Sequence, residues 1–182
     1  MEDLYNEKYF SERIPAEKDY HMAFQWLEWM SRFHKTNGTC LVLDYGCGTG
    51  KFASIFNYFN EGGYGYDPFL PDNALKGGVY WKDWSQRQFL DFDLVVAIDV
   101  FEHIPEDKVE ENIKRIVSTA KRFIICSICD VTLWDSYQDK SHVTCKSREW
   151  WISQFEKHGL KYIEPPEDWL FRRQMYIFEK VK

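Results

Sequence analysis

Three glycines stand within five positions at the end of an apolar run, in the stretch CLVLDYGCGTGKF (residues 40–52). Glycine has no side chain and adopts positive φ easily, so Gly46, Gly48 and Gly50 allow the backbone to approach a ligand closely. A helix that follows would offer unpaired N–H groups to the same ligand. Lys51 stands where a dinucleotide-binding turn needs its third glycine, which disfavours NAD chemistry. A plain tight turn is the alternative.

Acidic residues follow two further strand-like runs. Asp67 ends the run YGYD, 23 residues after Asp44. The two oxygens of a carboxylate can accept both hydroxyls of a ribose, although an Asp-Pro turn former would also explain this residue. Asp99, Glu102 and His103 follow the next long apolar run, in AIDVFEHIPE. Because ligands bind outside the carboxyl ends of parallel strands, we expect all these residues beside one crevice.

The order of the predicted elements indicates the fold class. The middle strands are continuous apolar runs, which is typical of a sheet covered by helices on both faces. We therefore predict an α/β fold with a Rossmann-like, doubly wound, mostly parallel sheet of about seven strands, the last strand antiparallel. Helices are expected at 17–34, 51–59, 106–120 and 147–160, and strands at 40–46, 64–67, 78–81, 92–99, 122–128, 161–164 and 174–182.

Composition excludes several classes of partner. The formal net charge is −6 and no basic stripe is present, which disfavours bulk nucleic acid. The start MEDLYNEKYF lacks the apolar segment of a signal peptide. The longest apolar run, 94–101, is too short to span a bilayer and contains Asp99. Five cysteines, an odd number without an export signal, favour a reducing compartment. We expect a cytoplasmic protein that does not enter membranes.

Five segments together resemble the class I S-adenosylmethionine-dependent methyltransferases. They are YNEKYF, LDYGCGTGKF, YGYD, FDLVVAIDVFEHI and SHVTCKSREWWISQFEKHGL, which span nearly the whole chain. The resemblance is nearest the small-molecule branch, which includes the ubiquinone-biosynthesis O-methyltransferases and many sugar and metabolite enzymes. It implies a single methyltransferase domain over 1–182, with an N-terminal helical segment (1–36), a cofactor-binding half (37–128) and an acceptor-side tail (129–182).

The resemblance also implies roles for residues of the cofactor site. The turn Gly46–Gly50, with Cys47, would wrap the methionine and ribose of S-adenosylmethionine, and the backbone at Asp99 would face the methionine tail. Asp44 would lie near the ammonium group, or serve chiefly to orient the turn. Asp67 would bind the ribose hydroxyls. Asp83 would reach the adenine amino group with Trp84 flanking the ring, although a surface aspartate and a core tryptophan explain this pair equally well.

Two histidines are candidates for a general base. His103 and His142 have the right chemistry to accept a proton near neutral pH if the methyl acceptor is a hydroxyl. The alternative for His103 is a role in starting a helix. A further alternative is that alignment of the methyl group with its acceptor supplies most of the rate without a base. Aromatic residues that could line the acceptor side are Tyr9, Trp134, Tyr137 and Trp150, although core packing explains most such residues.

The pattern C-x-x-C…H-x-x-C is superficially like that of a zinc site. It is formed by Cys126, Cys129, His142 and Cys145. The first two lie on or just beyond a strand, where odd spacing turns them to opposite faces, so we predict no metal and free thiols instead. We expect an enzyme that transfers a methyl group to a small molecule, with oxygen favoured as the acceptor atom. A non-catalytic domain that binds the cofactor as a pseudoenzyme or regulatory partner is the alternative. The oligomeric state is not predicted.

Overall fold

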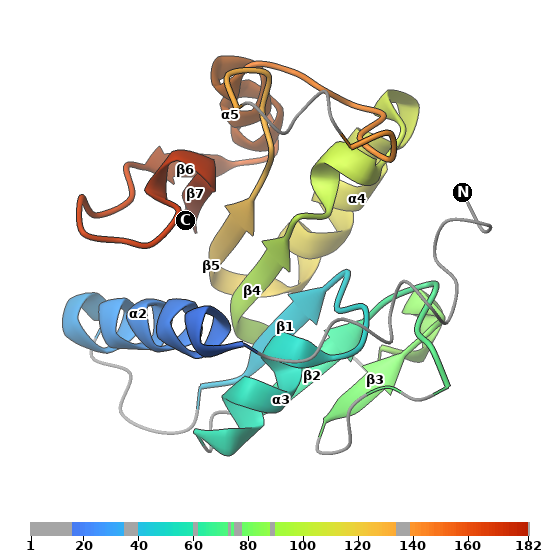
Figure 1. The fold of residues 1–182 in the computed structure, drawn as a ribbon, viewed down its shortest axis with the longest axis vertical. Helices are drawn as coiled ribbons and strands as arrows, with labels where there is room; N and C mark the ends of the chain where they lie inside the picture. Colours follow the sequence, from blue (N-terminus) through green and yellow to red (C-terminus); the bar gives the residue numbers. More distant parts are fainter. Residues whose placement is uncertain are drawn as a thin grey trace.

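Seven strands form one sheet in the computed structural model, which describes residues 16–34, 40–59, 62–72, 74, 78–87, 90–133 and 139–181. Their order across the sheet is β3-β2-β1-β4-β5-β7-β6. Figure 1 shows this sheet running from β3 at one edge, through β1 and β4, to β6 and β7. The strands are β1 (Val42–Tyr45), β2 (Gly63–Tyr66), β3 (Val79–Trp81), β4 (Phe92–Ile98), β5 (Ala120–Ser127), β6 (Leu160–Ile163) and β7 (Met175–Lys180).

The sheet is doubly wound and mostly parallel. Strand β1 pairs in parallel with β2 on one side and with β4 on the other, so the strand order reverses beside β1. Only β7 opposes its neighbours, pairing antiparallel with both β5 and β6. The predicted fold class, including the antiparallel last strand, is therefore confirmed. The reversal creates a crevice at the carboxyl ends of β1 and β4, which is where ligands bind in such folds.

Helices cover both faces of the sheet. Val42 of β1 belongs to one core with Trp26, on the side of α2 and α3. Its neighbour Leu43 belongs to the other core with Ile113 and Trp151, on the side of α4 and α5. Adjacent strand residues point to opposite faces, so burial on both sides explains the continuous apolar runs of the sequence. The helices are α2 (Glu17–His34), α3 (Lys51–Tyr58), α4 (Glu106–Thr119) and α5 (Arg148–Glu156).

The segment between β4 and α4 differs from a simple loop. Phe101–His103 forms a short 3-10 helix, η2. Pro105 then stands directly before the first turn of α4. The helix predicted over 106–120 ends one residue early, because Ala120 already pairs with Phe92 of β4 as the first residue of β5. Strand pairing thus overrides the helical preference of alanine. No helix within the described residues is long and apolar enough to cross a membrane.

Candidate active site

A cavity of about 440 Å³ opens at the carboxyl ends of β1, β2 and β4. Its walls are the glycine-rich turn after β1, the residues that follow β2, the segment that follows β4 and the polar side of α4. This is the crevice expected from the reversal of strand order. Of the predicted cofactor residues, those that line it are Asp44, Gly46, Cys47, Gly48, Asp67 and Asp99.

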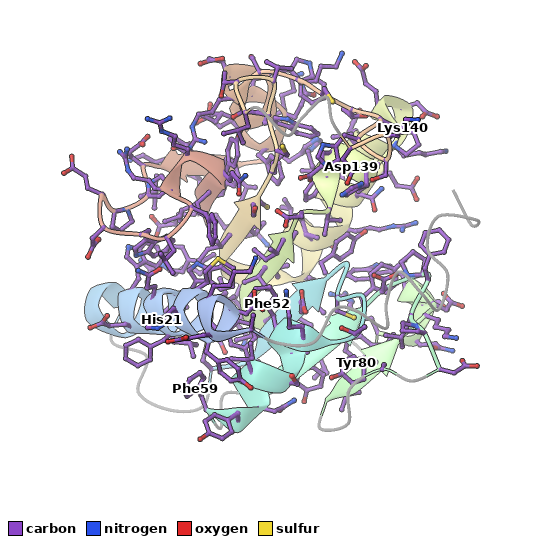
Figure 2. The ribbon with its side chains drawn as sticks, viewed as in Figure 1. His21, Phe52, Phe59, Tyr80, Asp139 and Lys140 are labelled. Carbon is purple, nitrogen blue, oxygen red and sulfur yellow. The ribbon has the colours of Figure 1, made fainter. Side chains whose placement is uncertain are left out.

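The glycine-rich turn leaves no room for side chains at two positions. Gly46 has φ +78°, and a Cβ there would lie 2.4 Å from a methyl carbon of Val100. Gly50 has φ +82°, and a Cβ there would lie 2.5 Å from the ring of Tyr80, which Figure 2 labels on β3. The amide of Gly46 donates to the carbonyl of Tyr66, 2.7 Å away, so the turn is tied to the end of β2. The two glycines therefore allow the turn to pack closely against Val100 and Tyr80, while their approach to a ligand stays a prediction.

Asp67 joins the ends of two strands. Its Oδ2 accepts from the amide of Gly48 at 2.8 Å, and its Oδ1 accepts from the amide of Phe69 at 2.7 Å. Burial raises the pKa of this carboxyl, and the two amide bonds oppose that rise. Each carboxylate oxygen has a second lone pair, so both can still accept hydrogen bonds from a ligand in the cavity. The turn-forming and ligand-binding interpretations of Asp67 are thus compatible.

Asp44 is a buried acid on the cavity wall. Desolvation raises its pKa to about 7, against the partial relief of a hydrogen bond from the amide of Ala53 at 3.4 Å. A buried carboxylate of this kind favours a cationic ligand, because attraction to the cation offsets the free-energy cost of removing the charge from water. Cys47 also lines the cavity, and burial raises the pKa of its thiol well above the usual value, so it remains a neutral thiol.

Asp99 adopts an unusual backbone conformation where β4 ends. Its φ is +54°, in the left-handed region that aspartate tolerates better than most residues. The hydroxyl of Ser127 donates to its Oδ1 at 2.5 Å, and its amide donates to the carbonyl of Ser127 at 3.0 Å. These bonds to the neighbouring strand hold the strained residue in place at the cavity wall.

Asp83 and Trp84 are not among the residues that line the cavity. Asp83 is at the surface, where its Oδ1 accepts from the amide of Ser85 at 2.9 Å and that bond lowers its pKa. Trp84 packs edge-on against two tyrosine rings. The centroid of its ring lies 5.5 Å from that of Tyr45 and 5.0 Å from that of Tyr66. The structure therefore places Trp84 against two residues that line the cavity, and the adenine role of Asp83 and Trp84 stays a prediction.

The two candidate bases meet in space. The rings of His103 and His142 lie edge to face, with centroids 4.8 Å apart. His103 lines the cavity and its Nδ1 lies 3.2 Å from the carbonyl oxygen of Ser141. Burial, followed by the nearby His142, lowers the pKa of His103, so its ring is neutral at pH 7. His142 stands behind it, 3.8 Å from a carboxylate oxygen of Asp139.

Of the predicted acceptor-side residues, Tyr9, Trp134 and Tyr137 lie outside the described residues. Trp150, on α5, is not among the residues that line the cavity. Its ring contacts Trp151, with centroids 4.8 Å apart, and the Nζ of Lys146 lies 5.4 Å from its centroid. Trp150 therefore packs on α5, and its acceptor-side role stays a prediction.

Sequence reasoning missed the polar side of α4. Lys108, Asn112 and Arg115 line the cavity, opposite the apolar face that packs on the sheet. The hydroxyl of Tyr45 donates to Oδ1 of Asn112 in a very short hydrogen bond. The signal in the sequence was the spacing of these three residues at i, i+4 and i+7, which puts them on one face of a helix beside a strand end already assigned to the site.

Comparisons with known proteins agree with this geometry. A family profile described as "Methyltransferase domain" matches residues 16–165. The fold is similar to that of magnesium protoporphyrin IX methyltransferase from Synechocystis PCC 6803, solved with bound SAM, at TM-score 0.70 and 14% identity, over 99% of this chain and 95% of that one. CalS10, an amino pentose methyltransferase from Micromonospora echinaspora solved with SAM, aligns at TM-score 0.69 and 14% identity, over 89% and 92% of the two chains.

A third structure is the sugar N-methyltransferase KedS8 from Streptoalloteichus sp ATCC 53650, at TM-score 0.70 and 12% identity, over 91% of this chain and 89% of that one. The comparison with curated proteins found no match. The identities are too low to carry more than the fold, but the family profile spans most of the sequence. The chain therefore belongs to the methyltransferase-domain family and has the class I methyltransferase fold.

Proposed function

We propose that the protein transfers a methyl group from S-adenosylmethionine to a small-molecule acceptor, with oxygen favoured over nitrogen or carbon. The observation that carries this proposal is a pair of buried carboxylates on either side of the glycine-rich turn. Asp44 and Asp67 both line the cavity, and both have raised pKa values because they are buried. S-adenosylmethionine offers an ammonium group to one and two ribose hydroxyls to the other.

The remaining cavity residues fit the methionine half of that cofactor. The turn from Gly46 to Gly50 would follow the methionine and ribose, and the backbone at Asp99 would face the methionine tail. Binding of the ammonium group beside Asp44 would restore its charged form, because a close positive charge lowers the pKa of a carboxyl. Asp83 and Trp84 remain the proposed contacts of the adenine ring.

In the transfer itself, a lone pair on the acceptor oxygen attacks the methyl carbon. The new O–C bond forms as the S–C bond breaks. The electron pair of the S–C bond stays on sulfur, which turns the sulfonium into a thioether. The hydroxyl proton must leave, and neutral His103 on the cavity wall can accept it, with His142 behind it. Aligning the methyl group and the oxygen supplies much of the rate.

Charge and composition support a small acceptor. The net charge of −6 disfavours nucleic acid, and the acceptor contacts that we propose, Tyr9, Trp134 and Tyr137, are aromatic and suit a ring or a sugar face. The five cysteines are free, which suits a reducing cytoplasm. The choice of oxygen depends on His103, the neutral histidine on the cavity wall.

Calorimetry and turnover test the proposal separately. We expect S-adenosylmethionine and S-adenosylhomocysteine to bind with micromolar Kd, and NADH to bind far more weakly. Incubation with a cell extract and labelled cofactor should then produce S-adenosylhomocysteine and a labelled small molecule. Binding without any product would favour the non-catalytic alternative. Absence of cofactor binding would contradict the proposal.

A further inference from the structure

Three ligand-type side chains gather behind the cavity wall. Glu102 and His103 belong to the short helix η2 after β4, and His142 comes from the segment before α5. Each offers one atom of a kind that binds metal ions, and these atoms lie within 4.8 Å of one another. The two histidine rings are in contact, with centroids 4.8 Å apart.

The carboxyl of Glu102 is buried, and one of its two oxygens has no hydrogen-bond partner among the described residues. Its Oε1 accepts from the amide of Cys129 at 2.9 Å, but Oε2 is buried and has no hydrogen-bond partner in the described structure. Glu102 is fully buried. A buried polar atom without a partner is costly and calls for an explanation such as a bound ion. Two imidazole rings beside that carboxyl provide the other ligands of such an ion.

The backbone holds the cluster in place. The amides of Val143 and Thr144 both donate to the carbonyl of Glu102, at 2.9 and 3.0 Å. The hydroxyl of Thr144 also donates to the carbonyl of Ile104 at 2.6 Å. These bonds fasten the segment that carries His142 onto η2, so the two histidines meet without a ligand to draw them together.

His103 also has the second contact typical of a metal ligand. Its Nδ1 lies 3.2 Å from the carbonyl oxygen of Ser141. In metal sites a ligating histidine usually donates its other ring N–H to a carbonyl or a carboxylate, which fixes the tautomer. With Nδ1–H donated to Ser141, Nε2 is the ring nitrogen whose lone pair would bind the ion.

We propose that Glu102, His103 and His142 bind one divalent transition-metal ion at the wall of the cofactor cavity. Imidazole ligands favour zinc and its neighbours in the first transition row, whereas magnesium and calcium prefer oxygen alone. The set differs from the cysteine pattern considered in the sequence, since it contains no cysteine and joins η2 to the segment after β5. It replaces our expectation that the protein holds no metal.

Small side-chain movements would complete the site. Ligand atoms on a tetrahedral zinc ion, bound at about 2.0–2.1 Å, are roughly 3.3 Å apart. The three ligand atoms here lie within 4.8 Å of one another, so each needs to move by about an ångström or less towards the ion. Rotations of the two rings and of the carboxyl can supply such movements without changing the backbone.

The position of the cluster suggests what the ion does, and this step depends on the proposed function. His103 lines the cavity, so an ion bound to it has open positions on that side. A hydroxyl oxygen of the acceptor can bind there, lose its proton to solvent water more easily, and then attack the methyl carbon as described above. The ion would thus stand in for a general base and orient the acceptor.

Metal binding can be tested without knowing the acceptor. Tag-free protein, stripped with a chelator and dialysed, is titrated with Co²⁺ by visible absorption and with Zn²⁺ in competition with a coloured chelator. We expect one ion per chain. The variants Glu102→Gln, His103→Gln and His142→Gln should each weaken binding by about 100-fold or more. His158→Gln, which removes a histidine outside the cluster, should leave binding unchanged.

Cofactor titrations on the same samples separate this proposal from the previous one. Variants that keep their affinity for S-adenosylmethionine but lose the ion are folded and support the site. Lack of saturable binding of Co²⁺ and Zn²⁺ by the native chain overturns it, even if the cofactor binds normally. Unchanged ion affinity in both Glu102→Gln and His142→Gln overturns it as well. An ion that binds while the cofactor does not would instead contradict the proposed function.

The open coordination position has a test of its own. Acetohydroxamate, a small oxygen ligand, is added to the Co²⁺-loaded protein while the visible absorption is followed. We expect the bands to shift, because the ligand enters the open positions. An unchanged spectrum would overturn the role of the ion in binding the acceptor.

Discussion

The carboxylate of Asp67 accepts a hydrogen bond from the amide of Gly48, 2.8 Å away and 19 residues earlier in the chain. This bond joins the residue that follows β2 to the glycine-rich turn that follows β1. It means that Asp67 shapes the turn before any ligand arrives, and that loss of its side chain affects both the ligand and the turn. The effect of a substitution must therefore be divided between affinity and stability.

We expect Asp67→Ala to weaken binding of S-adenosylmethionine by about 1–3 kcal/mol, because two ribose hydroxyls lose their charged acceptor. Asp67→Asn keeps one acceptor oxygen for the backbone and should show a smaller loss of stability than Asp67→Ala. Calorimetry gives the affinity, and chemical denaturation gives the free energy of unfolding.

Asp72→Ala is the matched control for Asp67. The side chain of Asp72 is almost fully exposed and pairs with Lys82 at the surface, so its removal should change neither quantity appreciably. If Asp67→Ala binds the cofactor as tightly as the native chain does, the ribose role of Asp67 is wrong. The turn would then be its whole purpose.

Gly46→Ala should damage the site more than its backbone conformation alone would explain. A Cβ at Gly46 would lie 2.4 Å from a methyl carbon of Val100, which itself lines the cavity. We expect a loss of stability of about 1–3 kcal/mol from overpacking, in addition to the cost of a positive φ. Affinity for S-adenosylmethionine should fall by about tenfold or more, which corresponds to 1.4 kcal/mol.

Gly159→Ala separates the two contributions. Gly159 has nearly the same φ, +77° against +78°, but a Cβ there would meet nothing within 4 Å. Its substitution should cost about 1–2 kcal/mol of stability and leave cofactor affinity unchanged. Equal losses of affinity in the two variants would show that the close approach at Gly46 has no bearing on the ligand.

The raised pKa of Asp44 predicts that cofactor affinity depends on pH. In the free protein this pKa is about 7, and an ammonium group bound beside the carboxyl would lower it. Below pH 7 the carboxyl must therefore lose a proton before the cofactor binds. Kd should then rise about tenfold for each unit by which the pH falls. Calorimetry across pH 5.5–8.5 would measure this slope. Asp44→Asn should bind weakly and with little slope over the same range.

The free energy of unfolding should depend on pH in the opposite way from cofactor affinity, because it should fall as the pH rises. The folded pKa of Asp44, about 7, lies above the ordinary value of 3.8 for an aspartate, so the folded state holds the proton more tightly and loses stability as pH rises from 4 to 7. At pH 8 the native chain carries a buried charge, and Asp44→Asn should be more stable by roughly 1–3 kcal/mol. At pH 4 the two proteins should unfold alike. A native chain that is more stable than the variant at pH 8 would contradict this account.

Most of the fold could be predicted because its signals are local. Continuous apolar runs mark strands that are covered on both sides, and G-x-G-x-G marks the turn after β1. The errors were small and have tertiary causes. Ala120 looked helical by its neighbours, but it pairs with Phe92 across the sheet, and that partner lies 28 residues earlier.

The site was harder to predict, because its important relationships are between distant segments. Glu102 and His103 are neighbours in the sequence, and their place after β4 could be inferred. Their contact with His142 depends on how the segment after β5 folds back, through hydrogen bonds from two backbone amides to the carbonyl of Glu102. Backbone hydrogen bonds between distant segments cannot be predicted from the types of the residues that make them. The same holds for Trp84, whose position relative to the cavity depends on packing against Tyr45 and Tyr66.

The histidines provide the last prediction, which concerns turnover. His103→Gln and His142→Gln should bind S-adenosylmethionine normally and lose about 10²–10⁴-fold in turnover if either ring takes the acceptor proton. The pKa of His103 is lowered by burial, so a base at this position stays neutral and active at pH 6.5 and loses activity only at lower pH. The pH profile of kcat, measured on the native chain, would show that limb.

A structural role for these rings predicts a different result. If the rings only pack η2 against the segment that carries His142, the variants should melt at lower temperature while turnover per folded molecule is nearly kept. Ion ligation, by contrast, predicts that a chelator reduces the native turnover to that of the variants and that added Zn²⁺ restores it. His158→Gln should behave as the native chain in every assay. If neither histidine variant loses turnover, alignment of the methyl group with its acceptor carries the reaction, and neither a base nor a bound ion takes part.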